Sequence, residues 1–241
     1  MRTSPPRQRP SNVQSTVNDK WAQIICIHGL MYYPPELIDA RGTAEPQGVS
    51  TMFYAMIQNI LDKVPGGVSL PVEYPAGPTQ NTTSGEQFVI DIINRGRETC
   101  PDEKYALFGY SQGATLMLKV LDQLDCEAMK AVESVIFVGN PYRMPGKTSS
   151  FNGTGQHDDR HTIGMFAVTA IAQNLTIPQL SPEMDESGKV QDFCLQDDKV
   201  CASDPNCACQ LPAGHLSYGA VDDVQESAIQ HVVNRLTGSK V

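Results

Sequence analysis

The pentapeptide Gly109-Tyr-Ser-Gln-Gly113 has the residue types and spacing of a nucleophilic serine held on a tight turn. Residues 105–109 form a short apolar run typical of a buried strand, and residues 114–124 have the apolar content of a largely buried helix. A sharp corner between the two needs glycine on both sides of the serine, because β-carbons there would collide with neighbouring backbone. The sequence therefore predicts that Ser111 is a nucleophile at the carboxyl edge of a sheet.

A serine hydroxyl needs a histidine to accept its proton and an acid to orient that histidine. On a doubly wound hydrolase sheet the three follow in the order serine, acid, histidine. His157 and His161 precede the last predicted strand and so break this order, and His231 falls within a predicted amphipathic helix. His215 lies in a glycine-flanked loop just before that helix, and we predict that it is the general base.

The acid is expected after the last strand, where Asp197 and Asp198 lie between Cys194 and Cys201. A bridge between these cysteines would close a small loop and hold a carboxylate against the histidine. The spacing alone does not choose between the two aspartates.

The elements that must position these residues alternate between strands and helices. Such alternation indicates a parallel sheet with helices on both faces. We expect a three-layer α/β/α sandwich with a central, mostly parallel five-stranded sheet. The predicted strands are residues 36–39, 68–73, 105–109, 134–138 and 189–193.

Two helix boundaries are legible, and one long segment is not regular. Thr83 and Glu86 form a capping-box pattern before a helical face, and a last helix is expected from about Asp222. Residues 140–188 are rich in glycine, proline and polar residues, which predicts a surface excursion.

Composition restricts the class of protein. The chain has 241 residues, 40% of them hydrophobic and 19% charged, which fits one α/β domain. We predict a disordered leader over residues 1–20 and a single catalytic domain over residues 21–241. A net charge of −9 without a basic cluster in the folded region argues against nucleic acid, and no apolar run is long enough for a membrane span.

Cysteines and glycosylation motifs indicate an extracellular protein. The chain has seven cysteines and three Asn-x-Thr sequons, at Asn81, Asn152 and Asn174, as a secreted glycoprotein would. The N-terminus, however, lacks a convincing signal peptide.

Four separated blocks resemble the cutinase and acetylxylan esterase family of small secreted α/β-hydrolases. They are Ala40–Glu45, Cys100-Pro-Asp with Gly109–Gly113, Cys194–Cys201 and His215–Gly219. The resemblance implies a triad of Ser111, Asp198 and His215, and it selects Asp198 over Asp197. It also implies an oxyanion hole formed by Thr43 and the N–H group of Gln112.

The resemblance further implies a disulfide between Cys194 and Cys201. In the family, the partner of the cysteine at Cys100 lies nearer to the Arg-Gly-Thr block than Cys26 does, so a Cys26–Cys100 bridge is left open. Cys126, Cys207 and Cys209 have no assigned partner. Residues 27–29, Ile-His-Gly, imitate a lipase oxyanion turn, but that alternative would leave the Ala40–Glu45 block unexplained.

These features predict a monomeric serine carboxylester hydrolase that needs no metal and no cofactor. The His215-Leu-Ser-Tyr218 block resembles the cutinase branch, which implies hydrophobic acyl esters or polyesters as substrates. Ile177, Leu180 and Leu211 are candidate substrate contacts or, alternatively, ordinary loop anchors. Other readings are an acetylxylan esterase, a non-catalytic glycan-binding protein on the same fold, and an intracellular lipase or thioesterase.

Overall fold

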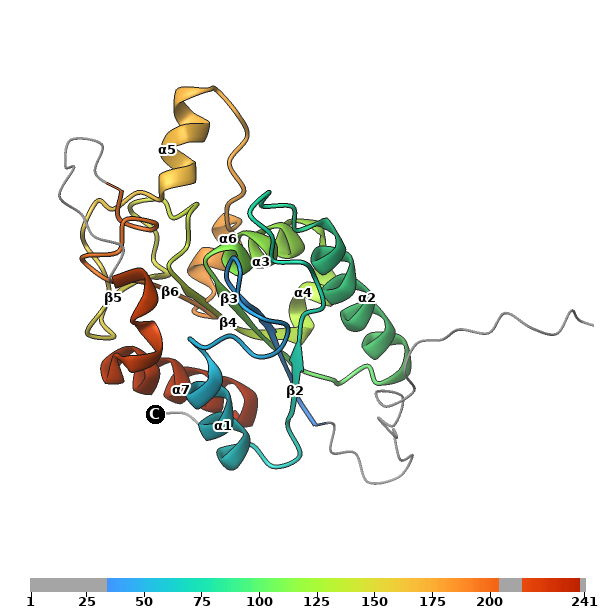
Figure 1. Cartoon of the computed structure of the whole chain (residues 1–241). Coiled ribbons are helices and arrows are strands. Elements are labelled where there is room, and N and C mark those ends of the chain that lie inside the picture. Colours follow the sequence, from blue (N-terminus) through green and yellow to red (C-terminus); the bar gives the residue numbers. More distant parts are fainter. Residues whose placement is uncertain (1–33, 204–213, 239–241) are drawn as a thin grey trace, which may run out of the picture. The chain divides into compact units, whose positions relative to one another are not determined.

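The computed structural model describes residues 34–203 and 214–238 (Figure 1). In that part of the chain the elements follow in order: β1 Glu36–Ala40, α1 Tyr54–Lys63, β2 Val68–Pro71, α2 Thr83–Thr99, β3 Tyr105–Tyr110, α3 Gln112–Gln123, α4 Cys126–Ala131, β4 Val132–Val138, β5 Ser150–Asn152, α5 Met165–Ala172, α6 Pro182–Glu186, β6 Val190–Cys194, the 3₁₀ turns η1 Gly214–Leu216 and η2 Tyr218–Ala220, and α7 Asp222–Thr237. The leader predicted over residues 1–20 lies outside the described residues.

The strands form one parallel sheet in the order β2-β1-β3-β4-β6-β5. The described residues thus contain six strands, where the sequence predicted five. The additional strand, β5, lies in the excursion predicted over residues 140–188. It has only three residues at the edge of the sheet, which is too short for an alternation of apolar and polar side chains to become visible.

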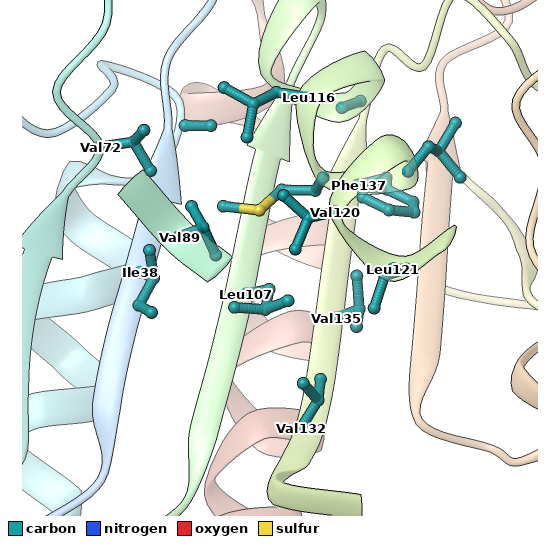
Figure 2. Packing of buried hydrophobic residues seen from close by; sticks show 14 of the residues in the cluster. Ile38, Val72, Val89, Leu107, Leu116, Val120, Leu121, Val132, Val135 and Phe137 are labelled. Atoms are coloured by element: carbon teal, nitrogen blue, oxygen red, sulfur yellow. The ribbon is translucent and has the colours of Figure 1, made fainter. Parts of the chain in front are cut away.

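Helices cover both faces of the sheet. Successive side chains of a strand point to opposite faces, and apolar residues occupy both faces here. On β3, Tyr105 and Leu107 join one hydrophobic cluster, while Ala106 and Phe108 join another. The first cluster packs under α2, α3 and α4, and Figure 2 shows side chains of β1, β3 and β4 meeting those of α3. The second cluster packs under α1 and α7.

The helix boundaries differ slightly from the prediction at α2. Thr82, not Thr83, is the N-cap residue, and its hydroxyl donates to the Glu86 side chain at 2.5 Å instead of capping the helix. The last helix begins at Asp222 as predicted, and Val224, Ala228 and Val232 are buried on one of its faces.

The strand order reverses direction between β1 and β3. From this pair the chain continues outward to β2 on one side and to β4, β6 and β5 on the other. In open α/β sheets, ligands bind at the carboxyl ends of the strands where such a reversal occurs. The loops after β1 and β3, which carry Thr43 and Ser111, meet at this position.

Candidate active site

Ser111 lies between the last residue of β3 and the first residue of α3. Its backbone is in a strained region, with φ 53° and ψ −114°. The Ser111 N–H donates to the Val138 carbonyl at 3.1 Å, so the end of β4 holds this conformation. The strained corner lifts the hydroxyl above the sheet edge.

The close packing of α3 on β1 explains why a glycine, Gly113, stands two residues after the serine. A β-carbon at Gly113 would stand 1.9 Å from the Ala40 carbonyl oxygen at the end of β1. The first turn of α3 therefore packs directly on β1, which only glycine permits. This contact places the N-terminus of α3 beside the loop after β1.

The structure brings Ser111, His215 and Asp198 into one hydrogen-bonded chain. His215 Nε2 lies 2.9 Å from Ser111 Oγ, and His215 Nδ1 lies 2.9 Å from Asp198 Oδ2. Asp198 is fully buried, and its Oδ1 accepts the Val200 N–H at 2.8 Å. A carboxylate at Nδ1 favours the tautomer protonated there, which leaves Nε2 free to accept the serine proton.

The histidine backbone is held from β3. The Tyr110 hydroxyl donates to the His215 carbonyl at 2.9 Å, and the two rings lie 5.0 Å apart between centroids. The residue that precedes the serine thus also fixes the segment that carries His215.

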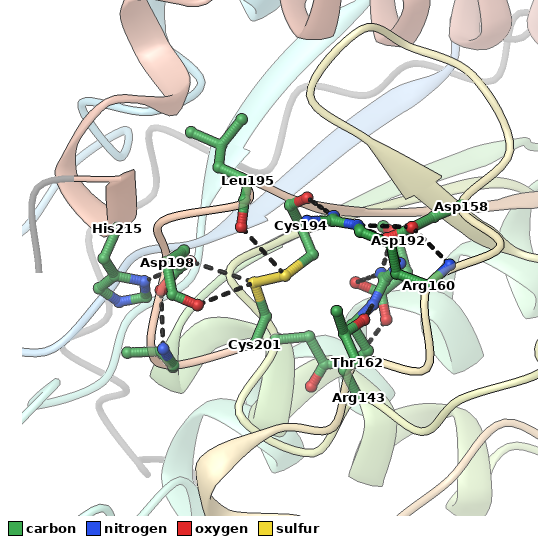
Figure 3. Close-up of a disulfide and its surroundings, with 12 residues drawn as sticks. Arg143, Asp158, Arg160, Thr162, Asp192, Cys194, Leu195, Asp198, Cys201 and His215 are labelled. Atoms are coloured by element: carbon green, nitrogen blue, oxygen red, sulfur yellow. Dashed lines mark hydrogen bonds and ion pairs between the residues drawn. A yellow bond between two sulfur atoms is a disulfide. The ribbon is translucent and has the colours of Figure 1, made fainter. Parts of the chain in front are cut away.

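The acid lies in a loop closed by the disulfide Cys194–Cys201, shown in Figure 3. The bridge links the end of β6 to the residue three positions after Asp198, and the Cys201 sulfur lies 3.3 Å from Asp198 Oδ2. Asp197, the other aspartate of this loop, is exposed. The bridge therefore fixes the loop at both ends.

Thr43 is exposed on the loop after β1 and faces the start of α3. Its Oγ1 donates to Gln112 Oε1 at 3.4 Å and accepts from Gln80 Nε2 at 3.0 Å. Gln112 is the first residue of α3, where backbone N–H groups have no partner within the helix. The helix dipole adds partial positive charge at that end. Thr43 and the N–H of Gln112 can thus stabilise an oxyanion together.

Glu45 holds this loop in place, which the sequence did not reveal. Its carboxylate accepts four hydrogen bonds: from the Gly42 N–H at 2.6 Å, the Ser50 hydroxyl at 2.9 Å, and the Thr51 N–H and hydroxyl at 2.9 and 2.6 Å. Glu45 belongs to the block Ala40–Glu45, so its position in that block was the available signal.

A buried ionic cluster supports the acid loop from the other side (Figure 3). Arg143, 2% exposed, pairs with Asp158 at 2.9 Å and with Asp192 of β6 at 3.2 Å. Arg160 pairs with Asp158 and also donates to the Cys194 carbonyl at 2.6 Å. The excursion after β4 is thereby tied to β6 and to the disulfide.

Burial raises the pKa of both aspartates of this cluster, but their net pKa shifts have opposite directions. Burial tends to raise the pKa of Asp158, but the hydrogen bonds and charges of Arg160 and Arg143 outweigh it and hold that pKa below its ordinary value. For Asp192, burial dominates and raises the pKa despite Arg143. The cluster is therefore strongly charged at Asp158.

The remaining candidate residues lie in the hydrophobic core, in loops and on α7. Leu180 is 9% exposed and belongs to the hydrophobic cluster under α2 and α3, which makes it a core residue, whereas Ile177 is half-buried. His157 pairs with Asp159 in a loop, and His231 donates to the Lys189 carbonyl from α7.

Several predictions fall on residues outside the described ones. These are the Cys26–Cys100 bridge, the lipase-like turn at His28-Gly29, the substrate contact Leu211, and the unassigned Cys207 and Cys209.

In the described ranges, no set of three or more histidine, cysteine or acidic side chains is arranged to hold a metal ion. None of the helices placed there has the length and apolar character of a membrane span.

The sequence and the fold of this chain are similar to those of known proteins. The Cutinase family model matches residues 34–236. A cutinase of Hypocrea jecorina is 31% identical over 110 residues, which cover 43% of this chain and 44% of the relative. The chain thus spans less than half the length of the curated cutinase that it matches.

Solved structures match over more of the chain. A cutinase-like protein from Cryptococcus sp. is 32% identical with a TM-score of 0.73, covering 86% of this chain and 97% of that one. An acetylxylan esterase superposes with a TM-score of 0.65 at 22% identity, covering 85% of this chain and 100% of that one. At that identity the second likeness concerns the fold alone.

Proposed function

This chain belongs to the cutinase family of serine esterases, and we propose that it hydrolyses carboxylic esters through an acyl-enzyme on Ser111. The observation that carries the proposal is the hydrogen-bonded chain from Ser111 Oγ through His215 to the buried Asp198. A serine so placed has a base for its proton and a fixed partner for that base.

The proposed reaction has two halves. Ser111 Oγ attacks the ester carbonyl carbon while its proton passes to His215 Nε2, and the N–H of Gln112 with Thr43 stabilises the resulting oxyanion. The carbon–oxygen bond to the alcohol then breaks, and the alcohol leaves with the proton from His215. Water, deprotonated by His215, attacks the acyl-enzyme and releases the acid and Ser111.

We propose hydrophobic acyl esters or polyesters as the substrate class. Leu216 directly follows the base and is 68% exposed. Ile171 and Leu175, at and just after the end of α5, are also exposed. A large apolar side chain exposed next to the base favours an acyl chain over a sugar, and the end of α5 adds exposed apolar surface. The disulfide at the acid loop supports a secreted enzyme, since such bridges persist in oxidising compartments.

The test is hydrolysis of p-nitrophenyl acetate, butyrate, octanoate and palmitate by the purified protein and by Ser111→Ala. We expect the highest kcat/KM between butyrate and octanoate, and a loss of roughly 10⁴-fold or more in the variant. Ser227→Ala is the matched control: this half-buried serine of α7 donates to the Gly155 carbonyl at 3.4 Å and makes no described hydrogen bond to the triad, so the variant should behave like wild type.

Other outcomes would select other functions. Rapid cleavage of acetyl esters with no activity on longer chains would replace this substrate class with acetylated polysaccharide. A folded protein that hydrolyses no ester and does not react with a fluorophosphonate would be a binding protein, because only an activated serine takes that label.

A further inference from the structure

Tyr218 connects the acid to the segment that carries the base. It is fully buried and begins η2, three residues after His215. Its hydroxyl donates to Asp198 Oδ2 at 2.6 Å and accepts the Leu195 N–H at 3.1 Å. One phenol therefore contacts both the acid and the backbone at the start of the acid loop.

The hydroxyl shares its acceptor with the base. Asp198 Oδ2 receives both the His215 Nδ1–H, at 2.9 Å, and the Tyr218 O–H, while Oδ1 receives the Val200 N–H. Three donors thus fix the rotation of the carboxylate. Hydrogen bonds to a carboxylate also stabilise its negative charge and weaken its hold on a neighbouring cation.

We propose that Tyr218 is a positioning residue for the reaction: it orients Asp198 toward His215 and limits how strongly that carboxylate retains the imidazolium. The inference rests on the proposed function and adds to it a fourth side chain. A base that releases its proton readily to the leaving alcohol turns over faster, because the imidazolium is the acid of that step.

The surroundings keep the phenol protonated. Burial raises the pKa of Tyr218 far above its ordinary value, and the charges of Asp198 and Asp192 raise it further. Asp192 is paired with Arg143, and Tyr110 faces His215 from β3 without contacting the carboxylate in any described hydrogen bond. Tyr218 is therefore a donor at every pH at which the enzyme would work.

The test is the pH profile of kcat/KM for Tyr218→Phe, which removes one oxygen atom. We expect kcat to fall about ten-fold with KM within about two-fold of wild type. The acid limb should move to higher pH by about half a unit, since Asp198 would hold the imidazolium more strongly. Tyr105→Phe is the matched control, because its buried hydroxyl contacts Glu103 away from the site.

A second variant gives the opposite change and keeps the test valid if Tyr218→Phe does not fold. 3,5-Difluorotyrosine at position 218 keeps the shape but is a stronger donor, so the acid limb should move to lower pH. An active wild type whose profile moves in neither variant would overturn the role of Tyr218. A wild type without esterase activity and without fluorophosphonate labelling would instead overturn the proposed function.

Discussion

Gly139, the residue after β4, lies against the imidazole of His215. A β-carbon at Gly139 would stand 2.7 Å from both Cε1 and Nδ1 of that ring, and 3.0 Å from Asp198 Oδ2. The Gly139 N–H donates to the Phe193 carbonyl at 3.2 Å, so the backbone there is fixed to β6. His215 and Asp198 thus meet over a position where no side chain fits.

Replacement of Gly139 by alanine should displace His215 from Ser111. A displacement of about 1 Å lowers turnover by roughly 100-fold, so kcat for a p-nitrophenyl ester should fall by at least that factor. The measurement is steady-state kinetics, with thermal unfolding to show that the variant is folded.

Gly146→Ala separates the contact from backbone strain. Gly146 has a similar positive φ, 74° against 62° for Gly139, but nothing lies within 4 Å of its β-carbon position. The control should lose stability and keep its kcat. Equal losses of kcat in both variants would show that the contact with His215 is unimportant.

Thr43→Val tests the hydroxyl of the proposed oxyanion hole. Loss of a donor to the oxyanion lowers kcat by about 10- to 1000-fold with little change in KM, because the interaction strengthens in the transition state. Thr43→Ser retains the hydroxyl and should remain close to wild type. A fully active valine variant would leave the stabilisation to backbone N–H groups alone.

Arg143→Met tests the buried ionic cluster. It leaves Asp158 with Arg160 alone and Asp192 without its guanidinium partner, and removal of one member of a buried pair costs about 3–5 kcal/mol. The free energy of unfolding, from guanidinium titration at pH 7, should fall by that amount.

The control for Arg143 is Arg97→Met, which breaks an ion pair of the same type with the exposed Asp125. Exposed ion pairs contribute little to stability, so this variant should unfold close to wild type. If Arg143→Met were equally stable, the cluster would not anchor the excursion to β6.

Glu36→Gln should change the pH dependence of stability. Burial raises the pKa of Glu36 from 4.5 to about 7, the neighbouring Glu103 adds to this, and Arg95 opposes it. The folded state thus retains a proton that the unfolded chain loses, so stability contributed by this group is lost as pH rises from about 4.5 to 7. Above pH 7 the wild type carries a buried charge that the variant lacks.

We expect the variant to be more stable than wild type by ~1–3 kcal/mol at pH 8 and to show no gain at pH 4, as measured by thermal unfolding. Glu98→Gln, exposed on α2, changes the net charge equally and should show no such dependence. The same shift in Tm at both pH values would contradict this assignment.

The sequence predicted every described strand except β5. Nearly all residues of β1, β3 and β4 are buried, whereas β5 is a three-residue edge strand with two half-buried residues. Thr83 was wrongly predicted as a cap: α2 begins one residue earlier than the Thr83-x-x-Glu86 spacing implies, so Thr82 takes the N-cap position.

At the site, residue types and order predicted Ser111 and His215, but spacing could not separate Asp197 from Asp198, and only the family resemblance did. Their roles in catalysis stay predictions. Glu45, Arg143 and Tyr218 were not predicted as supporting residues. Arg143 contacts a partner 49 residues away, and no local pattern reports such a contact.

The hydrogen bond between Ser111 and His215 joins residues 104 positions apart. Closure of so long a segment is an entropic cost that a refolding chain overcomes only when β4 and β6 are paired and the segment after them has docked. Ester turnover after dilution from denaturant therefore measures completion of the sheet. The return of helical circular dichroism would report only the formation of individual helices.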